Sequence, residues 1–85
     1  MKVIHFNSSS IAWSKDMTNN RYFVLTQLEY LQRRLQARGY IYLSEVYEAF
    51  GAAWDPDNVN VCYRESEGFI PDMLMKDDEI IITIN

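Results

Sequence analysis

The feature that most constrains the fold of this chain is a long amphipathic segment, Asn20–Gly39. Four aliphatic residues recur in it at steps of four, three and four, which places them on one face of an α-helix. These residues are Val24, Leu28, Leu31 and Leu35. Asn19 or Asn20 is suited to cap the start of the helix, and Gly39 is placed to end it. The segment therefore predicts one long helix with a single apolar face.

Several further segments predict β-strands, because they are short and rich in β-branched or aromatic residues. They are Lys2–Phe6, Tyr40–Leu43, Val59–Arg64 and the hairpin Asp72–Ile84. Lys76–Asp78 forms the expected tip of the hairpin, and Pro71 is expected to interrupt strand pairing before it. Three of the four isoleucines of the second hairpin strand, which alternate along it, are expected to face the core. They are Ile80, Ile82 and Ile84.

A short helix is predicted after the strand Tyr40–Leu43. Ser44 is suited to cap this helix, Glu45 lies at the positive end of its dipole, and Gly51 is placed to end it. The next residues, Ala52–Asn58, predict a turn, because Asp-Pro and Asn58 strongly favour turns.

Residues 7–20 leave two alternatives open: a loop held in place by Trp13, or a short helical turn capped near Ser14. The chain as a whole predicts a single domain, residues 1–85. The order of its elements predicts the α+β class, with one long and one short helix packed on a small, mostly antiparallel sheet of three to five strands. The composition is that of an ordinary folded domain, because 48% of the residues are hydrophobic and only 24% are charged.

Histidine and cysteine occur once each, as His5 and Cys62. A typical zinc site needs several such ligands, so no metal site is expected. Cys62 is expected to be a buried, inert thiol, and nothing beside it supports a Cys62–His5 nucleophile pair. The acidic stretches Asp55–Asn58 and Lys76–Glu79 lack the pattern of a calcium loop. We therefore predict a protein with no enzymatic activity, no cofactor and no small-molecule ligand.

The hydropathy of the chain bears on its location. No stretch approaches the roughly 18 apolar residues that span a bilayer, so no membrane association is predicted. The first ten residues, MKVIHFNSSS, are too polar for a signal peptide. The expected location is the cytoplasm.

The formal net charge of −4 is unevenly distributed along the sequence. Residues 1–42 hold six basic and two acidic residues, whereas residues 43–85 hold two basic and ten acidic residues. Arg33, Arg34 and Arg38 crowd the end of the long helix. They either stabilise that helix end in solvent, as its dipole favours, or dock on an acidic partner such as the C-terminal half of a second copy.

The order helix, strand, helix also resembles the start of a winged helix-turn-helix DNA reader. Such a domain needs a second helix with basic residues on its outer face. Here the second helix carries Glu45 and Glu48 and no lysine or arginine. Nucleic-acid binding is therefore not expected, because phosphate contacts supply much of the affinity for nucleic acid. A degenerate winged-helix-like regulator, binding through the basic end of the long helix, remains the alternative interpretation.

The chain has six tyrosines, more than so small a core usually holds. Tyrosine favours positions that are partly apolar and partly exposed to solvent, including protein interfaces. The tyrosines either rim a partner-binding surface or shield a thin sheet from solvent. The first alternative predicts a partner-binding site in which tyrosines and arginines lie together. Its residues are Arg33, Arg34, Arg38, Tyr40, Tyr42 and Tyr47.

The stretch Arg38–Gly51, RGYIYLSEVYEAFG, resembles a group of small uncharacterised proteins carried by phages and integrated mobile elements of Gram-positive bacteria. In that group a helix ends in Arg-Gly-aromatic, and a Val-Tyr-Glu helix ends in a glycine. The matching residues here are Arg38, Gly39, Tyr40, Leu43, Val46, Tyr47, Glu48 and Gly51. The chain departs from the group after Gly51, where VNVCYR replaces a Gly-Trp-Val-Tyr strand.

The resemblance covers about residues 23–64 and implies no activity. Together with the absence of catalytic motifs, it favours a non-enzymatic interaction or accessory protein of a phage or mobile element. Such a protein would bind another protein, or a second copy of itself, through its tyrosine-bearing surface.

Overall fold

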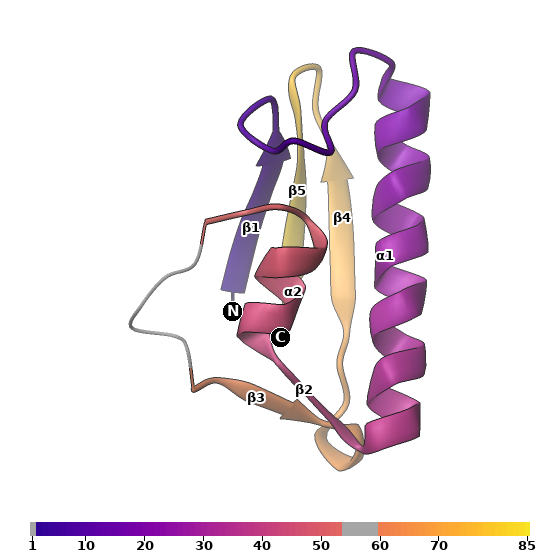
Figure 1. Cartoon of the computed structure of the whole chain (residues 1–85), viewed down its shortest axis with the longest axis vertical. Helices are drawn as coiled ribbons and strands as arrows, with labels where there is room; N and C mark the ends of the chain where they lie inside the picture. Colours follow the sequence, from indigo (N-terminus) through magenta and orange to yellow (C-terminus); the bar gives the residue numbers. More distant parts are fainter. Residues whose placement is uncertain (1, 54–59) are drawn as a thin grey trace.

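The computed structural model describes residues 2–53 and 60–85 (Figure 1). The elements are β1 (Lys2–Asn7), α1 (Met17–Arg38), β2 (Tyr40–Tyr42), α2 (Leu43–Ala49), β3 (Cys62–Arg64), the 3-10 turn η2 (Glu65–Glu67), β4 (Pro71–Met75) and β5 (Glu79–Ile84). The predicted α+β class, with one long and one short helix, is confirmed. The described strands form two antiparallel sheets, one of order β1-β5-β4 and one of order β2-β3.

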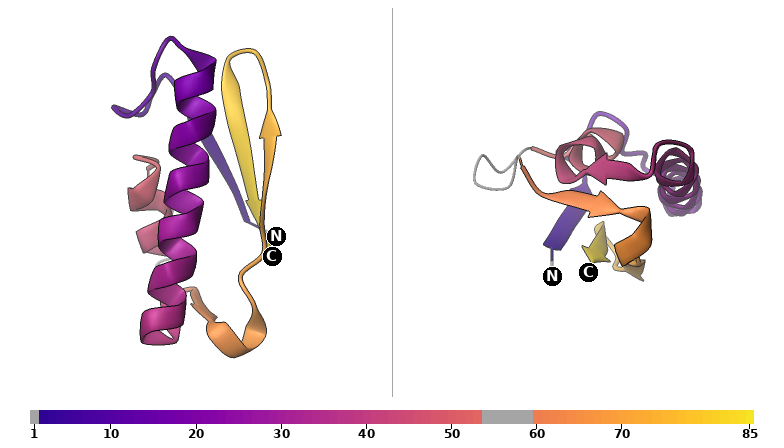
Figure 2. Two further views of the ribbon diagram at one scale, coloured as in Figure 1. Left: turned by 90° about the vertical axis from the view of Figure 1, so that its right-hand side faces the viewer. Right: turned by 90° about the horizontal axis from the view of Figure 1, so that it is seen from below.

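In Figure 1 α2 lies in front of the three-stranded sheet and α1 stands beside it, next to β4, and the side view in Figure 2 shows both helices on the same side of the sheet. Because side chains alternate along β5, every second residue is turned toward the helices, and three of these residues are isoleucines, as predicted. Those isoleucines are Ile80, Ile82 and Ile84, each 0% exposed. In β1, Ile4 and Phe6 pair with Ile82 and Ile80 and extend the same buried face.

Aromatic side chains join β1 to both helices. The Phe6 ring stacks on Phe23 of α1 at 5.3 Å between centroids, and it meets the edge of Trp13 at 5.2 Å. Phe50, which follows α2, lies 6.2 Å from the Phe6 ring. The loop before α1 is therefore held by Trp13, as one of the two sequence alternatives predicted.

The start of α1 differs from the prediction. Asp16 caps the helix, because its carboxylate accepts a hydrogen bond from the backbone N–H of Thr18 at 2.9 Å. Asn19 and Asn20, the predicted caps, both lie within the first turn. Asn20 is 0% exposed and binds both backbone groups of Ser14, accepting from its N–H at 2.8 Å and donating to its carbonyl at 2.7 Å.

The start of α2 also differs from the prediction, because Ser44 lies within the helix and Tyr42 takes the cap position. The carboxylate of Glu45 reaches back and accepts a hydrogen bond from the Tyr42 backbone N–H at 2.7 Å. This contact satisfies a backbone donor at the helix start, which is the role that the prediction gave to the Ser44 hydroxyl.

The strands after α2 are only partly as predicted. Residues 54–58 of the predicted turn Ala52–Asn58, and the start of the predicted strand at Val59, lie outside the described residues. β3 itself has three residues, with Tyr63 turned into the core. Pro71 does not interrupt pairing but begins the edge strand β4, a position where the missing N–H of proline is tolerated. The hairpin tip at Lys76–Asp78 is confirmed.

Two glycines end the helices in left-handed conformations and make a matched stability test. Gly39 has φ of 85° with nothing within 4 Å of an added Cβ, whereas at Gly51, with φ of 63°, the Cβ would meet Ser10 Oγ at 2.6 Å. We expect Gly39→Ala to lower the free energy of unfolding by about 1 kcal/mol and Gly51→Ala by about 2–3 kcal/mol. Urea unfolding measures both, and equal losses would show that Ser10 moves aside freely.

Candidate functional site

The two strands β2 and β3 form a short ribbon across the lower end of the molecule in Figure 1. Its register pairs Tyr40 with Arg64, Ile41 with Tyr63, and Tyr42 with Cys62. Because side chains alternate along a strand, the two residues of the middle pair share one face. That face is turned into the core, where Ile41 is 0% exposed and Tyr63 is buried. The other two pairs therefore lie together on the outer face.

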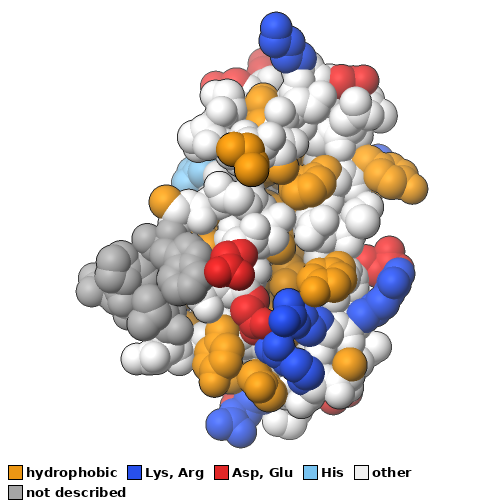
Figure 3. Space-filling view, in the orientation of Figure 1, with side chains coloured by type: hydrophobic (Ala, Val, Ile, Leu, Met, Phe, Trp, Pro, Cys, Tyr) orange, Lys and Arg blue, Asp and Glu red, His pale blue; other side chains and the backbone are white. Residues whose placement is uncertain are grey.

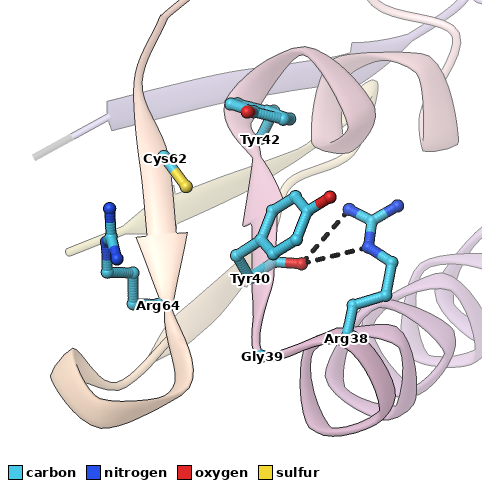
Figure 4. Close-up of a pocket in the computed structure, with 6 residues that line it drawn as sticks. All are labelled: Arg38, Gly39, Tyr40, Tyr42, Cys62 and Arg64. Atoms are coloured by element: carbon cyan, nitrogen blue, oxygen red, sulfur yellow. Dashed lines mark hydrogen bonds between the residues drawn. The ribbon is translucent and has the colours of Figure 1, made fainter.

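This outer face borders a partly open pocket of about 350 Å³. The residues that line it, called the ribbon face below, are Arg38, Gly39, Tyr40, Tyr42, Cys62 and Arg64 (Figure 4). The rings of Tyr40 and Tyr42 meet edge to face at 5.6 Å, and each tyrosine remains about two-fifths exposed. The pocket is therefore aromatic in its middle and carries guanidinium groups from two elements.

Arg38, the last residue of α1, is fixed in place on this surface. Its guanidinium lies over the Tyr40 ring, 4.5 Å from the centroid, and donates to the Tyr40 carbonyl at 3.2 and 3.3 Å. It also donates to both carboxylate oxygens of Glu45, at 3.0 and 2.7 Å. This fork-like pairing uses the planar geometry that distinguishes arginine from lysine.

Glu45 connects three elements, because its carboxylate accepts hydrogen bonds from Arg38 and from the Tyr42 N–H and forms an ion pair with Arg34 at 3.2 Å. The hydrogen bond from Arg38 is the main cause that lowers the pKa of the Glu45 carboxyl, against the opposing effect of burial. The same hydrogen bond raises the pKa of Arg38. Both groups are therefore charged at neutral pH.

These contacts also close one edge of the ribbon. Gly39 accepts from the Glu65 N–H and Leu43 donates to the Val61 carbonyl, so the backbone groups of Tyr40 and Tyr42 point away from β3. On that outer edge the Tyr40 carbonyl is taken by Arg38, and the Tyr42 N–H is taken by Glu45. Side chains thus block the edge of β2 to an added strand.

Glu45→Gln should make the stability less dependent on pH. Folding lowers the Glu45 pKa, so the ionised group stabilises the fold above its unfolded-state pKa, and this contribution is lost as the pH falls through the folded-state pKa. We expect the variant to be less stable by about 1–2 kcal/mol at neutral pH, with the difference shrinking in acid. Urea unfolding from about pH 7 to pH 3 measures it.

The control for this experiment is Glu48→Gln, which removes an exposed carboxylate from the same helix. It should leave both the stability and its pH dependence nearly unchanged, because exposed charges contribute little. If the two variants lost equal stability, the contacts of Glu45 would not stabilise the fold.

The structure brings together three of the predicted site residues, Arg38, Tyr40 and Tyr42, and separates the others. Tyr47 is only 9% exposed and lies in the core, so it is not available to a partner. Arg33 forms an ion pair with Glu29 along α1 and does not line the pocket. Arg34 lies behind the ribbon face, where it binds Glu45 and the Tyr30 hydroxyl.

Cys62 and Arg64 lie on the ribbon face but were not among the predicted site residues. The alternation of VNVCYR was visible, and it places these two residues opposite Tyr63. Nothing in the sequence showed that this strand pairs with Tyr40–Tyr42, which lies far from it along the chain.

Folding also brings the two oppositely charged halves of the sequence into contact. Arg34 and Arg38 come from the basic half, and both bind Glu45 of the acidic half. In Figure 3 the Lys and Arg side chains near the lower end of the molecule lie directly beside Asp and Glu side chains. With the ion pair between Arg33 and Glu29, all three arginines that were expected to attract an acidic second copy are thus paired within the chain.

His5 and Cys62 lie at separate places. His5 lies on β1, where its Nδ1 is 3.2 Å from Glu79 Oε2, and the pocket that Cys62 lines does not include it. Within residues 2–53 and 60–85 no cluster of three or more His, Cys, Asp or Glu side chains is arranged to hold a metal ion. Over the same residues, no helix is both long and apolar enough to span a membrane.

Comparisons of the chain with models of protein families, with curated proteins and with solved structures found no match.

Proposed function

We propose that this chain is a non-enzymatic protein–protein interaction module that binds a partner protein through the ribbon face. The observation that carries the proposal is the exposure of Tyr40 and Tyr42 beside Arg38 and Arg64 around one pocket. Tyrosine and arginine are enriched at the centres of interfaces and dominate their binding energy. The resemblance of Arg38–Gly51 to phage and mobile-element proteins leads us to propose the role of an accessory protein there.

The rigidity of the side chains on the ribbon face supports the proposal. Tyr40 is held between the ring of Tyr42 and the guanidinium of Arg38, and Arg38 is held in turn by Glu45. Side chains that are already fixed lose less conformational entropy when a partner binds. The inner face of the ribbon adds to this rigidity, because Ile41 and Tyr63 anchor it to the core.

The charges around the ribbon face favour a protein over a nucleic acid. Glu45 neutralises part of the positive charge of Arg34 and Arg38. Glu65 and Glu67 are exposed in η2, directly after Arg64. A phosphate backbone would meet these carboxylates, whereas binding of nucleic acid rests on several unopposed cations.

Selection from a displayed library of natural protein fragments tests the proposal. We expect Tyr40→Ala and Tyr42→Ala each to weaken a selected partner by about tenfold or more in calorimetry. The matched control is Tyr22→Ala, which removes a 74% exposed tyrosine from α1, outside the ribbon face. It should bind like the wild type, and circular dichroism should show that all three variants are folded.

Two results would contradict the proposal. Equal affinities for the wild type and both ribbon variants would place the binding surface elsewhere. Micromolar binding to random duplex DNA, weakening steeply with salt, would favour the winged-helix-like alternative.

A further inference from the structure

Arg64 differs from the other arginine of the ribbon face, because its side chain has no hydrogen bond or ion pair among the described residues. Arg38, by contrast, is bound to Glu45 and to the Tyr40 carbonyl. Arg64 is exposed and lies across the strand pair from Tyr40. A guanidinium left in this state keeps all of its donors for a ligand.

We propose that Arg64 binds a single carboxylate of the partner, an Asp or Glu side chain in a segment whose neighbouring residues pack on Tyr40 and Tyr42. This inference rests on the proposed function and names the chemistry of the partner. A carboxylate is the natural ligand of a free guanidinium, because the planar fork of arginine donates two parallel hydrogen bonds to it.

The geometry assigns this role to Arg64 and not to Arg38. In Figure 4 the two side chains lie on opposite sides of Tyr40, one on β3 and one at the end of α1. Arg38 already gives two nitrogens to Glu45. A second carboxylate there would compete with Glu45 and would lie close to its negative charge, which is unfavourable. Arg64 carries no such competitor within the pocket lining.

The surroundings of Arg64 limit the ligand to one negative charge. Glu65 and Glu67 lie in the turn that follows Arg64, and both are exposed. A second acidic residue next to the bound carboxylate would be repelled by them. The expected segment therefore has one acidic residue flanked by apolar or aromatic residues, and an acidic run or a phosphate backbone is disfavoured.

This charge limit also favours a different protein over a second copy. The most acidic stretch of this chain on the described surface is the hairpin tip, where Asp77, Asp78 and Glu79 are consecutive. Such a run does not match the isolated carboxylate that the pocket accepts. The isolated carboxylate of Asp72 on β4 already accepts a hydrogen bond from the Met73 N–H at 2.8 Å. The experiment must therefore distinguish binding of a different protein from binding of a second copy.

Selection from a displayed library of random peptides tests the inference, with the full chain as the target. We expect the enriched peptides to share one Asp or Glu next to aromatic residues. Arg64→Gln should weaken a synthetic consensus peptide by about tenfold, as should replacement of the peptide's acidic residue by its amide. Combining the two changes should add little further loss, because both remove the same contact.

The matched control is Arg21→Gln, which removes an exposed arginine from α1, outside the pocket lining. It should bind the peptide like the wild type. Arg64→Gln should melt at nearly the same temperature as the wild type, because the Arg64 side chain has no hydrogen bond or ion pair among the described residues.

The outcomes distinguish failure of this inference from failure of the proposed function. Two results would overturn the carboxylate as the ligand of Arg64 and leave the ribbon face as the binding surface. One is a set of peptides that need Tyr40 and Tyr42 for binding but carry no acidic residue. The other is that the affinity losses of Arg64→Gln and of the peptide amide simply add. Peptides indifferent to Tyr40→Ala and Tyr42→Ala, or no enriched peptide at all, would overturn both. Light scattering showing a wild-type dimer that Arg64→Gln abolishes would overturn the assignment to a different protein.

Discussion

Replacing Phe6 with alanine should lower the free energy of unfolding by about 3–5 kcal/mol. Phe6 is 0% exposed and is in ring contact with Trp13, Phe23 and Phe50. The substitution therefore leaves a cavity where β1, the loop before α1 and both helices meet. Because a domain of this size has a total stability of about 5–10 kcal/mol, this loss removes a large part of the total.

Urea unfolding followed by circular dichroism measures this loss. Phe6→Leu should be much milder, because most of the buried volume is kept. Val3→Ala is the matched control on the same strand, since Val3 points away from the core and is 45% exposed. A Phe6→Ala protein with nearly wild-type stability would show that this aromatic cluster does not hold the layers together.

Asn20→Asp should lower the free energy of unfolding by about 3–4 kcal/mol at neutral pH. The Asn20 amide donates to the Ser14 carbonyl at 2.7 Å, and in the variant a buried carboxylate oxygen would face that carbonyl without a proton. Burial and the carbonyl both raise the pKa of the new carboxyl above its unfolded-state value. The variant should therefore be most stable in acid and lose stability as the pH rises through this raised pKa.

The measurement is the difference in free energy of unfolding between wild type and variant from about pH 7 to pH 4. That difference should shrink on acidification. The control Asn19→Asp places a carboxylate on an exposed neighbour in the same helical turn, where it should be nearly neutral or slightly stabilising. If the loss of free energy of unfolding in Asn20→Asp did not change with pH, the contact with the Ser14 carbonyl would not depend on the Asn20 amide as a hydrogen-bond donor.

Long, regular segments were the part of the fold that the sequence revealed. The stripe Val24–Leu35 and the alternating Ile80–Ile84 are each long enough for their period to be unmistakable, and both face the core as predicted. Helix caps were mispredicted because several polar residues compete there. Asp16 caps α1 while Asn20 is used to hold Ser14, a contact that depends on the three-dimensional path of the loop.

The candidate site was predicted only in part, for a related reason. Strands of three residues carry too little pattern to show which of them pair, so Cys62 and Arg64 could not be placed beside Tyr40 and Tyr42. Tyr47 lies one helical turn beyond Leu43, and the sequence did not show that this face of α2 is turned to the core. Tertiary packing decided which tyrosines remained outside.

The pairing of Arg38 with Glu45 spans seven residues yet joins the end of α1, the edge of β2 and the start of α2. The last turn of α1 therefore cannot fray without releasing the first turn of α2. Their amide hydrogens are expected to exchange with solvent as one cooperative unit. A partner bound at Tyr40 would then slow amide hydrogen exchange in both helices. Binding at the lower end of the molecule would thus be detected in segments that the partner does not contact.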